Sequence, residues 1–447
     1  MPASHADPIA PVILGVTGLL FFAIMGRFLA RRLGQPSVLG ELIIGIVLGS
    51  VGSYLGFQVI LILREGPAVF DIINLALSGE PLAQAAREVL EEPAATRLLT
   101  VLEGPSGGVL MQVAHTVDVF SRYGVIFLLF LVGLESSVEE MRNVGIDSAR
   151  VAIVGVVLPF LLGFESMRLL QPDASLNTDL FVAAALGATS IGITARVLTD
   201  LGRQRSHEGR IILGAAVFDD ILGLLMLAIV SGIVVSGTVD VWNIAKVVAL
   251  ALLFLVGAVK LGPFILRATI RLLAKLDLVE AKMFTSFMFV MILAWMANLV
   301  GLATILGAFT AGVILHDGYF KHLHAEGDAV AIKDLIMPLE VILVPIFFIL
   351  MGIQVKLETF LDPHVLLTAA GLLIAAMLGK ILSGWAARGP ANRWLIGFGM
   401  MPRGEVGLIF AAIGKSLGLI TDALFSSVVL MVVVTTLVAP PLIKRMS

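Results

Sequence analysis

The chain has 447 residues, of which 58% are hydrophobic and only 14% are charged, and its mean hydropathy is +1.02. A soluble domain of this size needs more charge on its surface, so the composition excludes a soluble protein and indicates one that crosses a membrane many times. The formal net charge of −3 does not suggest a nucleic-acid partner. The absence of cysteine excludes disulfides and thiolate metal sites.

The apolar runs of the sequence predict thirteen membrane-spanning helices, since one span needs about 20 apolar residues. They cover roughly residues 9–31, 37–62, 108–134, 147–170, 177–200, 207–236, 241–272, 280–300, 302–316, 335–356, 363–387, 392–418 and 421–443. In the first run the basic residues follow the apolar stretch, which is the reverse of a cleaved signal peptide. We therefore expect an all-α polytopic membrane protein whose first helix is retained.

The placement of lysine and arginine predicts the orientation, because these residues gather in cytoplasmic connections. If the N-terminus lies outside, most of them fall on the cytoplasmic side. The outer connections then hold only Arg64, Arg87, Arg97, Arg168, Lys356 and Lys415. The sequence thus predicts a multi-pass protein of the cell (inner) membrane with its C-terminus in the cytoplasm.

The connection 63–107 is the one long connection, and it is acidic. Apolar residues recur in it at helical spacing: Leu82, Ala85, Ala86, Val89 and Leu90. This pattern favours an extracytoplasmic amphipathic helix that lies on the membrane surface or on the protein. A loose solvated loop is the alternative.

Two of the predicted spans are interrupted in their middle. Residues 187–194 read Gly-Ala-Thr-Ser-Ile-Gly-Ile-Thr, and residues 401–407 read Met-Pro-Arg-Gly-Glu-Val-Gly. Glycine weakens a helix, and Pro402 removes a backbone donor. Interrupted spans at corresponding places in two halves indicate a transport site built from broken helices. They are the fifth and twelfth helices, so two six-helix repeats joined by a linker helix would be inverted; kinked but unbroken helices are the alternative.

Two adjacent carboxylates, Asp219 and Asp220, lie inside the apolar run 211–235. A charged side chain at bilayer depth costs roughly 2.5–3.5 kcal/mol, and the usual reason for one is an ion or proton pathway. The alternative is a misplaced helix end, with both residues among the lipid headgroups. Because successive helix residues point about 100° apart, the two carboxylates should face different surroundings.

Lys380 is the other clear charge at bilayer depth, in the run 366–385. A buried lysine needs a carboxylate, so the simplest arrangement pairs Lys380 with Asp219 and leaves Asp220 available for an ion. Small residues near Lys380 and Asp219 would let their helices approach closely. Snorkelling of Lys380 to the interface is the alternative.

Three further charges lie in or beside the broken segments: Arg196, Arg403 and Glu405. Free backbone groups at half-helix ends need partners, so we favour a supporting role for these side chains over direct ion binding. His316, His322 and His324 cluster in a predicted cytoplasmic connection and could sense pH, although solvated histidine is the more common situation. No zinc-peptidase signature, nucleotide loop or Gly-x-Ser-x-Gly elbow is present, so we expect no enzyme and no cofactor.

The residues resemble the monovalent cation:proton antiporter-2 family, of the NapA and Kef membrane-domain type. The resemblance rests on residues 35–41 (Gln-Pro-Ser-Val-Leu-Gly-Glu), 189–196 (Thr-Ser-Ile-Gly-Ile-Thr-Ala-Arg), 218–220 (Phe-Asp-Asp) and 403–409 (Arg-Gly-Glu-Val-Gly-Leu-Ile), with Lys380 on the preceding helix. It covers nearly the whole chain except the connection 63–107, which is longer than the family pattern. Jointly these motifs are specific, whereas any one alone would be weak.

The resemblance implies a homodimer of thirteen-helix subunits that rock between two states and serve pH homeostasis. The dimerisation part would comprise approximately residues 9–62 and 280–316, and the ion-binding core approximately 108–236 and 335–443. Family pattern makes Asp220 the main cation ligand and Asp219 the partner of the lysine. Thr189 and Ser190 would line the site as further ligands of the monovalent cation.

The resemblance further implies exchange of sodium, lithium or potassium for protons, without an organic substrate. Since the chain carries no nucleotide-binding domain, it is less like a gated potassium-efflux system than a sodium/proton exchanger. We expect electrogenic exchange, in which Lys380 releases a proton when sodium takes its partner. A potassium/proton antiporter and a sodium-coupled symporter are the alternatives. A channel would need a filter-like loop, and an intramembrane aspartyl protease would need its two aspartates on separate helices.

Overall fold

A computed structural model of the chain describes residues 7, 9–35, 37–66, 69, 72, 75, 78–90, 92, 94–135, 145–190, 194, 197–198, 201–203, 206–236, 241–273, 278–300, 302, 304–323 and 330–446. Within these ranges the regular structure is entirely helical. Ten of the described helices are long and apolar enough to cross a membrane, and three shorter apolar helices accompany them, at Leu176–Ala185, Thr304–Ile314 and Val406–Ser416. The expected all-α membrane class is thus confirmed.

The α-helices are α1 (Ala10–Arg32), α2 (Ser37–Tyr54), α3 (Gln58–Glu65), α5 (Leu82–Val89), α6 (Ala94–Leu102), α7 (Gly107–Glu135), α9 (Ile146–Leu170), α10 (Leu176–Ala185), α12 (His207–Ser236), α13 (Val241–Leu273), α14 (Leu278–Leu299), α15 (Thr304–Ile314), α16 (Ile332–Ile353), α17 (Pro363–Ser383), α18 (Arg393–Gly399), α19 (Glu405–Ser416) and α20 (Asp422–Met446). Short 3-10 turns are η1 (Asp317–Leu323), η2 (Leu357–Leu361) and η3 (Gly384–Ala386).

One predicted helix is wrong, because the span 37–62 is two helices rather than one. α2 ends at Tyr54 and α3 begins at Gln58. Gly56 between them has φ +74°, a left-handed conformation that glycine adopts without strain and that ends an α-helix. The apolar pattern continues across this turn, so periodicity alone joined the two helices.

The chain divides into two compact units. The first unit is Met1–Arg122, Pro345–Ala369 and Ala411–Leu430, and the second unit is Tyr123–Val344, Ala370–Phe410 and Met431–Ser447. Several helices therefore contribute one end to each unit.

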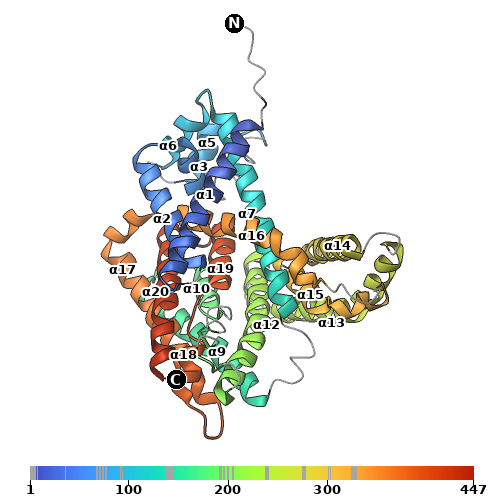
Figure 1. Cartoon of the computed structure of the whole chain (residues 1–447). Coiled ribbons are helices and arrows are strands. Elements are labelled where there is room, and N and C mark those ends of the chain that lie inside the picture. The colour runs from blue at the N-terminus through green and yellow to red at the C-terminus, as the bar shows by residue number, and fades with distance from the viewer. Residues whose placement is uncertain are drawn as a thin grey trace. The chain divides into compact units, whose positions relative to one another are not determined.

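In the first unit, α1 packs along α2 through two glycines (Figure 1). A Cβ added to Gly40 would come within 2.0 Å of the carbonyl oxygen of Gly26, so only glycine permits this approach. The amphipathic helix predicted in the connection 63–107 is present as α5, with Ala85 and Ala86 buried. α5 packs on α6, and α6 packs on α3, so this segment lies on the protein.

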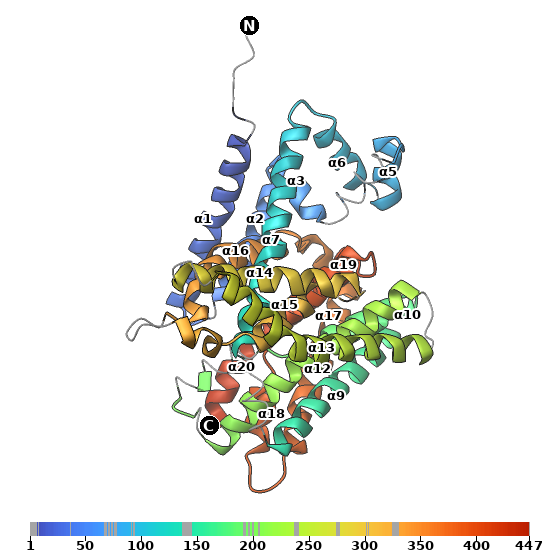
Figure 2. The ribbon, with the colours of Figure 1, turned by 90° about the vertical axis from the view of Figure 1, so that its right-hand side faces the viewer.

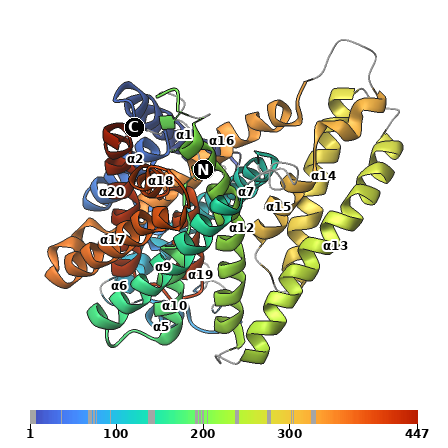
Figure 3. The same cartoon turned by 90° about the horizontal axis from the view of Figure 1, so that it is seen from below.

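In the second unit, α9, α10 and α12 pack against one another (Figure 2). α13, α14 and α15 pack against one another in the same unit (Figure 3), and α13 also packs against α12. Phe289 and Leu293 on α14, Ile314 on α15 and Leu266 on α13 lie in its buried apolar cluster. The first of these groups supports the candidate site.

Candidate ion site

Two helices of the second unit are interrupted where the sequence predicted breaks. α10 ends at Ala185, and after a turn at 186–187 residues 188–190 have no regular structure. α18 stops at Gly399, and α19 begins at Glu405 after a turn at Met400 and the four residues 401–404, which have no regular structure. The alternative of kinked but unbroken helices is therefore wrong for the described residues.

The two breaks cross and are hydrogen-bonded to each other. Three bonds join them: the backbone N–H of Ser190 donates to the carbonyl of Pro402 (2.9 Å), the Thr189 hydroxyl donates to the carbonyl of Met400 (3.3 Å), and the Thr194 hydroxyl donates to the carbonyl of Gly399 (2.6 Å). The side chains of Thr189 and Ser190 are buried. Each hydroxyl oxygen keeps lone pairs with which it can bind a cation. The place of Thr189 and Ser190 in the ion site stays a prediction.

Arg403 lies at the crossing and is completely buried. Its Nη1 donates to the carbonyl oxygens of Gly187 (3.3 Å) and Ala188. These carbonyls follow the end of α10, so the guanidinium supplies a donor to backbone groups beside the break. The Thr436 hydroxyl in turn donates to the carbonyl of Arg403. Among the described residues, Nε and Nη2 of Arg403 have no hydrogen-bond partner.

Lys380 on α17 and Asp219 on α12 form a fully buried ion pair, with Nζ 2.5 Å from Oδ1 and both side chains 0% exposed. The negative charge of Asp219 also acts on the Arg403 guanidinium. The second carboxylate oxygen of Asp219, Oδ2, has no hydrogen-bond partner among the described residues. The site thus contains one paired carboxylate with a vacant acceptor, beside the crossing of two broken helices. Lys380 and Asp219 are thus paired as the sequence predicted, and the complete burial of Lys380 excludes snorkelling of its ammonium to the interface.

Other predicted site residues lie outside what the structure describes. Asp220 is part of α12 and Glu405 opens α19, but their side chains are not among the described ones. Arg196 is outside the described residues altogether. Of the histidine cluster, His316 stacks on Tyr319 with ring centroids 4.1 Å apart, whereas the side chains of 322 and 324 are not described. The roles of all these residues stay predictions.

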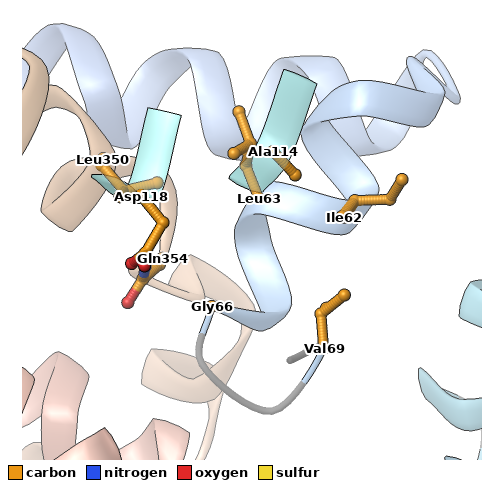
Figure 4. Close-up of a pocket in the computed structure, with 8 residues that line it drawn as sticks. All are labelled: Ile62, Leu63, Gly66, Val69, Ala114, Asp118, Leu350 and Gln354. Atoms are coloured by element: carbon orange, nitrogen blue, oxygen red, sulfur yellow. The ribbon is translucent and has the colours of Figure 1, made fainter. Parts of the chain in front are cut away.

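A small cavity of about 10 Å³, room for about one water molecule, lies in the first unit (Figure 4). Its lining is mostly apolar, and the polar side chains in it are Asp118 and Gln354. Asp118 already binds Arg122 at 2.7 Å, one helical turn along α7. A carboxylate with this partner and an amide do not make a cation site, so the cavity is a less suitable ion site than the buried pair.

The first unit also contains a charge cluster that the sequence did not predict. It comprises Arg64, Glu65, Lys356, Glu358, Lys415 and Asp422. Lys356 bridges Glu65 (2.7 Å) and Asp422 (2.6 Å), and Arg64 binds Glu358 (2.5 Å).

Three of these six residues, Arg64, Lys356 and Lys415, were expected as separate charges of outer connections. The cluster ties α3, the turn after α16 and the start of α20 together. These three segments are far apart in the sequence, so no residue spacing could have predicted that they meet.

The chain is similar to known proteins over nearly its whole length. The family described as "Sodium/hydrogen exchanger, transmembrane" matches residues 18–447. The chain is 34% identical over 446 residues to the "High-affinity Na(+)/H(+) antiporter NhaS3" of Synechocystis sp., covering 98% of this chain and 90% of that protein. It is 31% identical over 427 residues to the "Na(+)/H(+)-K(+) antiporter GerN" of Bacillus cereus, covering 93% and 91%.

A solved structure has the same fold. It is the sodium proton antiporter MjNhaP1 from Methanocaldococcus jannaschii, with a TM-score of 0.58, 16% sequence identity, and coverage of 97% of this chain and 96% of that one. At this identity the likeness concerns the fold alone. The family match, by contrast, spans nearly the whole sequence and includes both broken helices and the buried ion pair. The chain therefore belongs to the sodium/hydrogen exchanger family of multi-pass membrane transporters.

Proposed function

We propose that this protein is a secondary antiporter that exchanges a monovalent cation, sodium first of all, for protons. The observation that carries the proposal is the fully buried Lys380–Asp219 pair beside the crossing of two broken helices. Charges at that depth are costly, and ion transport is the usual reason for them. Relatives that cover more than nine-tenths of the chain are named as Na(+)/H(+) antiporters, which supports the same function.

The chemistry is competition for carboxylate oxygens. Burial penalises the charged form of a carboxylate. A carboxylate that holds a proton or a sodium ion is neutral, so it crosses the apolar barrier at a lower free-energy cost than an empty carboxylate anion. We assign the main cation site to Asp220, with Thr189 and Ser190 as neutral oxygen ligands. Asp219 holds Lys380 between turnovers. The loaded forms are mobile and the empty form is not, which makes exchange strict.

Exchange is electrogenic on this mechanism. Sodium displaces Lys380 from Asp219, the lysine gives up its proton, and a second proton leaves Asp220. One sodium ion then replaces two protons. Arg403, Glu405 and Arg196 support the ends of the half-helices rather than bind the ion, a role to which the carbonyl contacts of Arg403 are suited.

The proposed architecture has thirteen spans in two inverted repeats, and the ten long and three shorter apolar helices among the described residues support that count. The dimerisation part comprises residues 9–62 and 280–316, and the core comprises 108–236 and 335–443. Two subunits form a dimer in the cell membrane, with the N-terminus outside. Rocking of the core exposes the site to each side in turn.

The test is proton release from acidified everted vesicles when sodium is added without any organic substrate. We expect prompt release with sodium and none in vesicles that carry Asp220→Asn. Potassium is the second cation to test, because GerN is named a Na(+)/H(+)-K(+) antiporter. A response that requires an organic solute would identify a symporter and refute antiport.

A further inference from the structure

Lys356 lies at the centre of the charge cluster in the first unit. Its ammonium is 2.7 Å from Oε2 of Glu65 on α3 and 2.6 Å from Oδ2 of Asp422, the first residue of α20. The backbone N–H of Lys356 also donates to the hydroxyl oxygen of Ser426, one turn into α20, at 3.2 Å. One residue therefore ties the end of α3 to the start of α20.

The two carboxylates belong to helices that move relative to each other in the proposed function. Glu65 ends α3, and its neighbour Arg64 donates to the hydroxyl oxygen of Ser53 on α2 at 3.0 Å, so α3 is held to the proposed dimerisation part. Asp422 begins α20, which follows α19, the half-helix after the second break, and both lie in the proposed core. Rocking of the core must therefore change the distance between Glu65 and Asp422.

The ion pairs of Lys356 can break at a modest free-energy cost. The side chains of Lys356 and Glu65 are 12% and 11% exposed and that of Asp422 is 31% exposed, unlike the fully buried pair of the ion site. A cavity of about 10 Å³, room for about one water molecule, is lined by Glu65 and Lys356. When Lys356 leaves either carboxylate it keeps the other, and Asp422 also contacts the Lys415 ammonium at 2.8 Å.

We propose that Lys356, with Glu65 and Asp422, is a latch that closes the outer side of the protein and opens whenever the ion site faces outward. The inference rests on the proposed antiport by alternating access, and it adds the contact that must break for the outer side to open. In the closed state the start of α20 is held near the end of α3. In the open state α19 and α20 separate from α3. A brace that never opens is the alternative.

The sequence contains no cysteine, so introduced cysteines give a direct test. Glu65→Cys/Asp422→Cys should exchange sodium for protons in proteoliposomes of the purified protein. A short, reducible cross-linker between the two introduced thiols should stop exchange, because it replaces the latch with a bond that cannot open. Reduction of the cross-linker should restore exchange.

Two controls separate the latch from damage by the reagent. Lys415→Cys/Asp422→Cys shares one substitution with the test variant, but its cross-link joins α19 to α20 within the proposed core. This cross-link should leave exchange unchanged. A long, flexible cross-linker on Glu65→Cys/Asp422→Cys should also leave exchange unchanged, because it lets α20 separate from α3.

A reporter thiol measures opening without transport. The side chain of Ser426 is 0% exposed and contacts the backbone of Lys356, so a membrane-impermeant thiol reagent on the outer side should modify Ser426→Cys slowly. Lys356→Met leaves the carboxylates of Glu65 and Asp422 beside each other, and their repulsion favours opening. Because the rate of modification follows the fraction of open protein, Lys356→Met should raise it about tenfold.

A second reporter serves as the matched control. The side chain of Ser286 on α14 is also 0% exposed, but it lies away from the latch, in the second unit. Lys356→Met should leave the modification rate of Ser286→Cys unchanged. An equal rise at both reporters would show general loosening of the fold and would overturn the latch. A rise at Ser426→Cys that occurs only with reagent on the cytoplasmic side would overturn its outer position.

The remaining results also decide the proposal. Exchange that stops with the short cross-linker, and only in Glu65→Cys/Asp422→Cys, supports the latch. Undiminished exchange in that cross-linked variant shows a brace that never opens, and so does an unchanged modification rate of Ser426→Cys in Lys356→Met. If Lys356→Met does not fold, the cross-linked variants, which retain Lys356, decide the question. A wild type that exchanges no cation for protons refutes the proposed function, whereas the modification rates still show whether the latch opens.

Discussion

Breaking the Lys380–Asp219 pair from one side should be more harmful than removing both charges. The two side chains are 0% exposed and 2.5 Å apart, so neither charge is solvated by bulk water. Removal of one partner of such a pair costs about 3–5 kcal/mol, because the other charge stays buried without compensation. Lys380→Gln should therefore destabilise the protein by roughly this amount. The double variant Lys380→Gln/Asp219→Asn should be more stable than Lys380→Gln by about 2–4 kcal/mol, since it leaves no buried charge.

Thermal unfolding of the four proteins in one detergent, at several pH values, measures this cycle. A lower unfolding temperature in Lys380→Gln than in the double variant is the expected signature of one shared pair.

Transport under an imposed membrane potential completes the test. Wild-type exchange should respond to voltage, and Lys380→Gln should keep some exchange while losing the voltage response. If the lysine only braces the helices, the variant should be unstable but still electrogenic. The reasoning about the pair is refuted if Lys380→Gln unfolds at the same temperature as the double variant at every pH. An electroneutral wild type would refute the proton-carrying role.

Three further predictions concern Asp220, the pair Thr189 and Ser190, and Lys356. Asp220→Asn should abolish exchange in vesicles yet elute like the wild type on size-exclusion chromatography, because it removes the charge that sodium and protons share; near-normal exchange would contradict the assignment. A double change of Thr189 and Ser190 to Ala should raise the apparent KM for sodium more than it lowers kcat, and an unchanged KM would remove both residues from the site. Lys356→Met should lower stability by about 2–3 kcal/mol, less than the loss of a fully buried partner, because the cluster is partly exposed.

The same cluster gives a pH dependence with a definite sign. Burial lowers the pKa of Lys356, but Glu65 and Asp422 outweigh it and raise that pKa above 10.5. Burial likewise raises the pKa of Glu358, but the bond from Arg64 outweighs it and holds that pKa below 4.5.

A raised lysine pKa gives stability that is complete below pH 10.5 and lost as the pH rises further. A lowered glutamate pKa gives stability present above pH 4.5 and lost as the pH falls further. Stability in detergent should therefore be flat between these limits as far as Lys356 and Glu358 are concerned, and Lys356→Met should remove mainly the alkaline loss. A variant whose alkaline loss is unchanged would show that the bridge contributes nothing.

The broken helices could be predicted from sequence because their cause is local. Pro402 lacks a backbone donor and the glycines around it weaken an α-helix, while the apolar runs on both sides still require a span. The buried pair could be predicted for a similar reason, since a lone lysine at bilayer depth needs a carboxylate and few are available there. The split of the span 37–62 was missed because Gly56 looks like any glycine until its backbone conformation is known.

The sequence by itself determined the membrane class, nearly all helix positions, the two breaks and the partner of Lys380, because each follows from the cost of burying polar groups in a lipid bilayer. The tertiary structure decided which backbone groups meet at the crossing, and it placed the Arg403 guanidinium on two freed carbonyls. It also decided that Lys356 joins residues from three distant segments. Such contacts depend on how helices far apart in the chain are rotated and how closely they approach, and no local pattern encodes that.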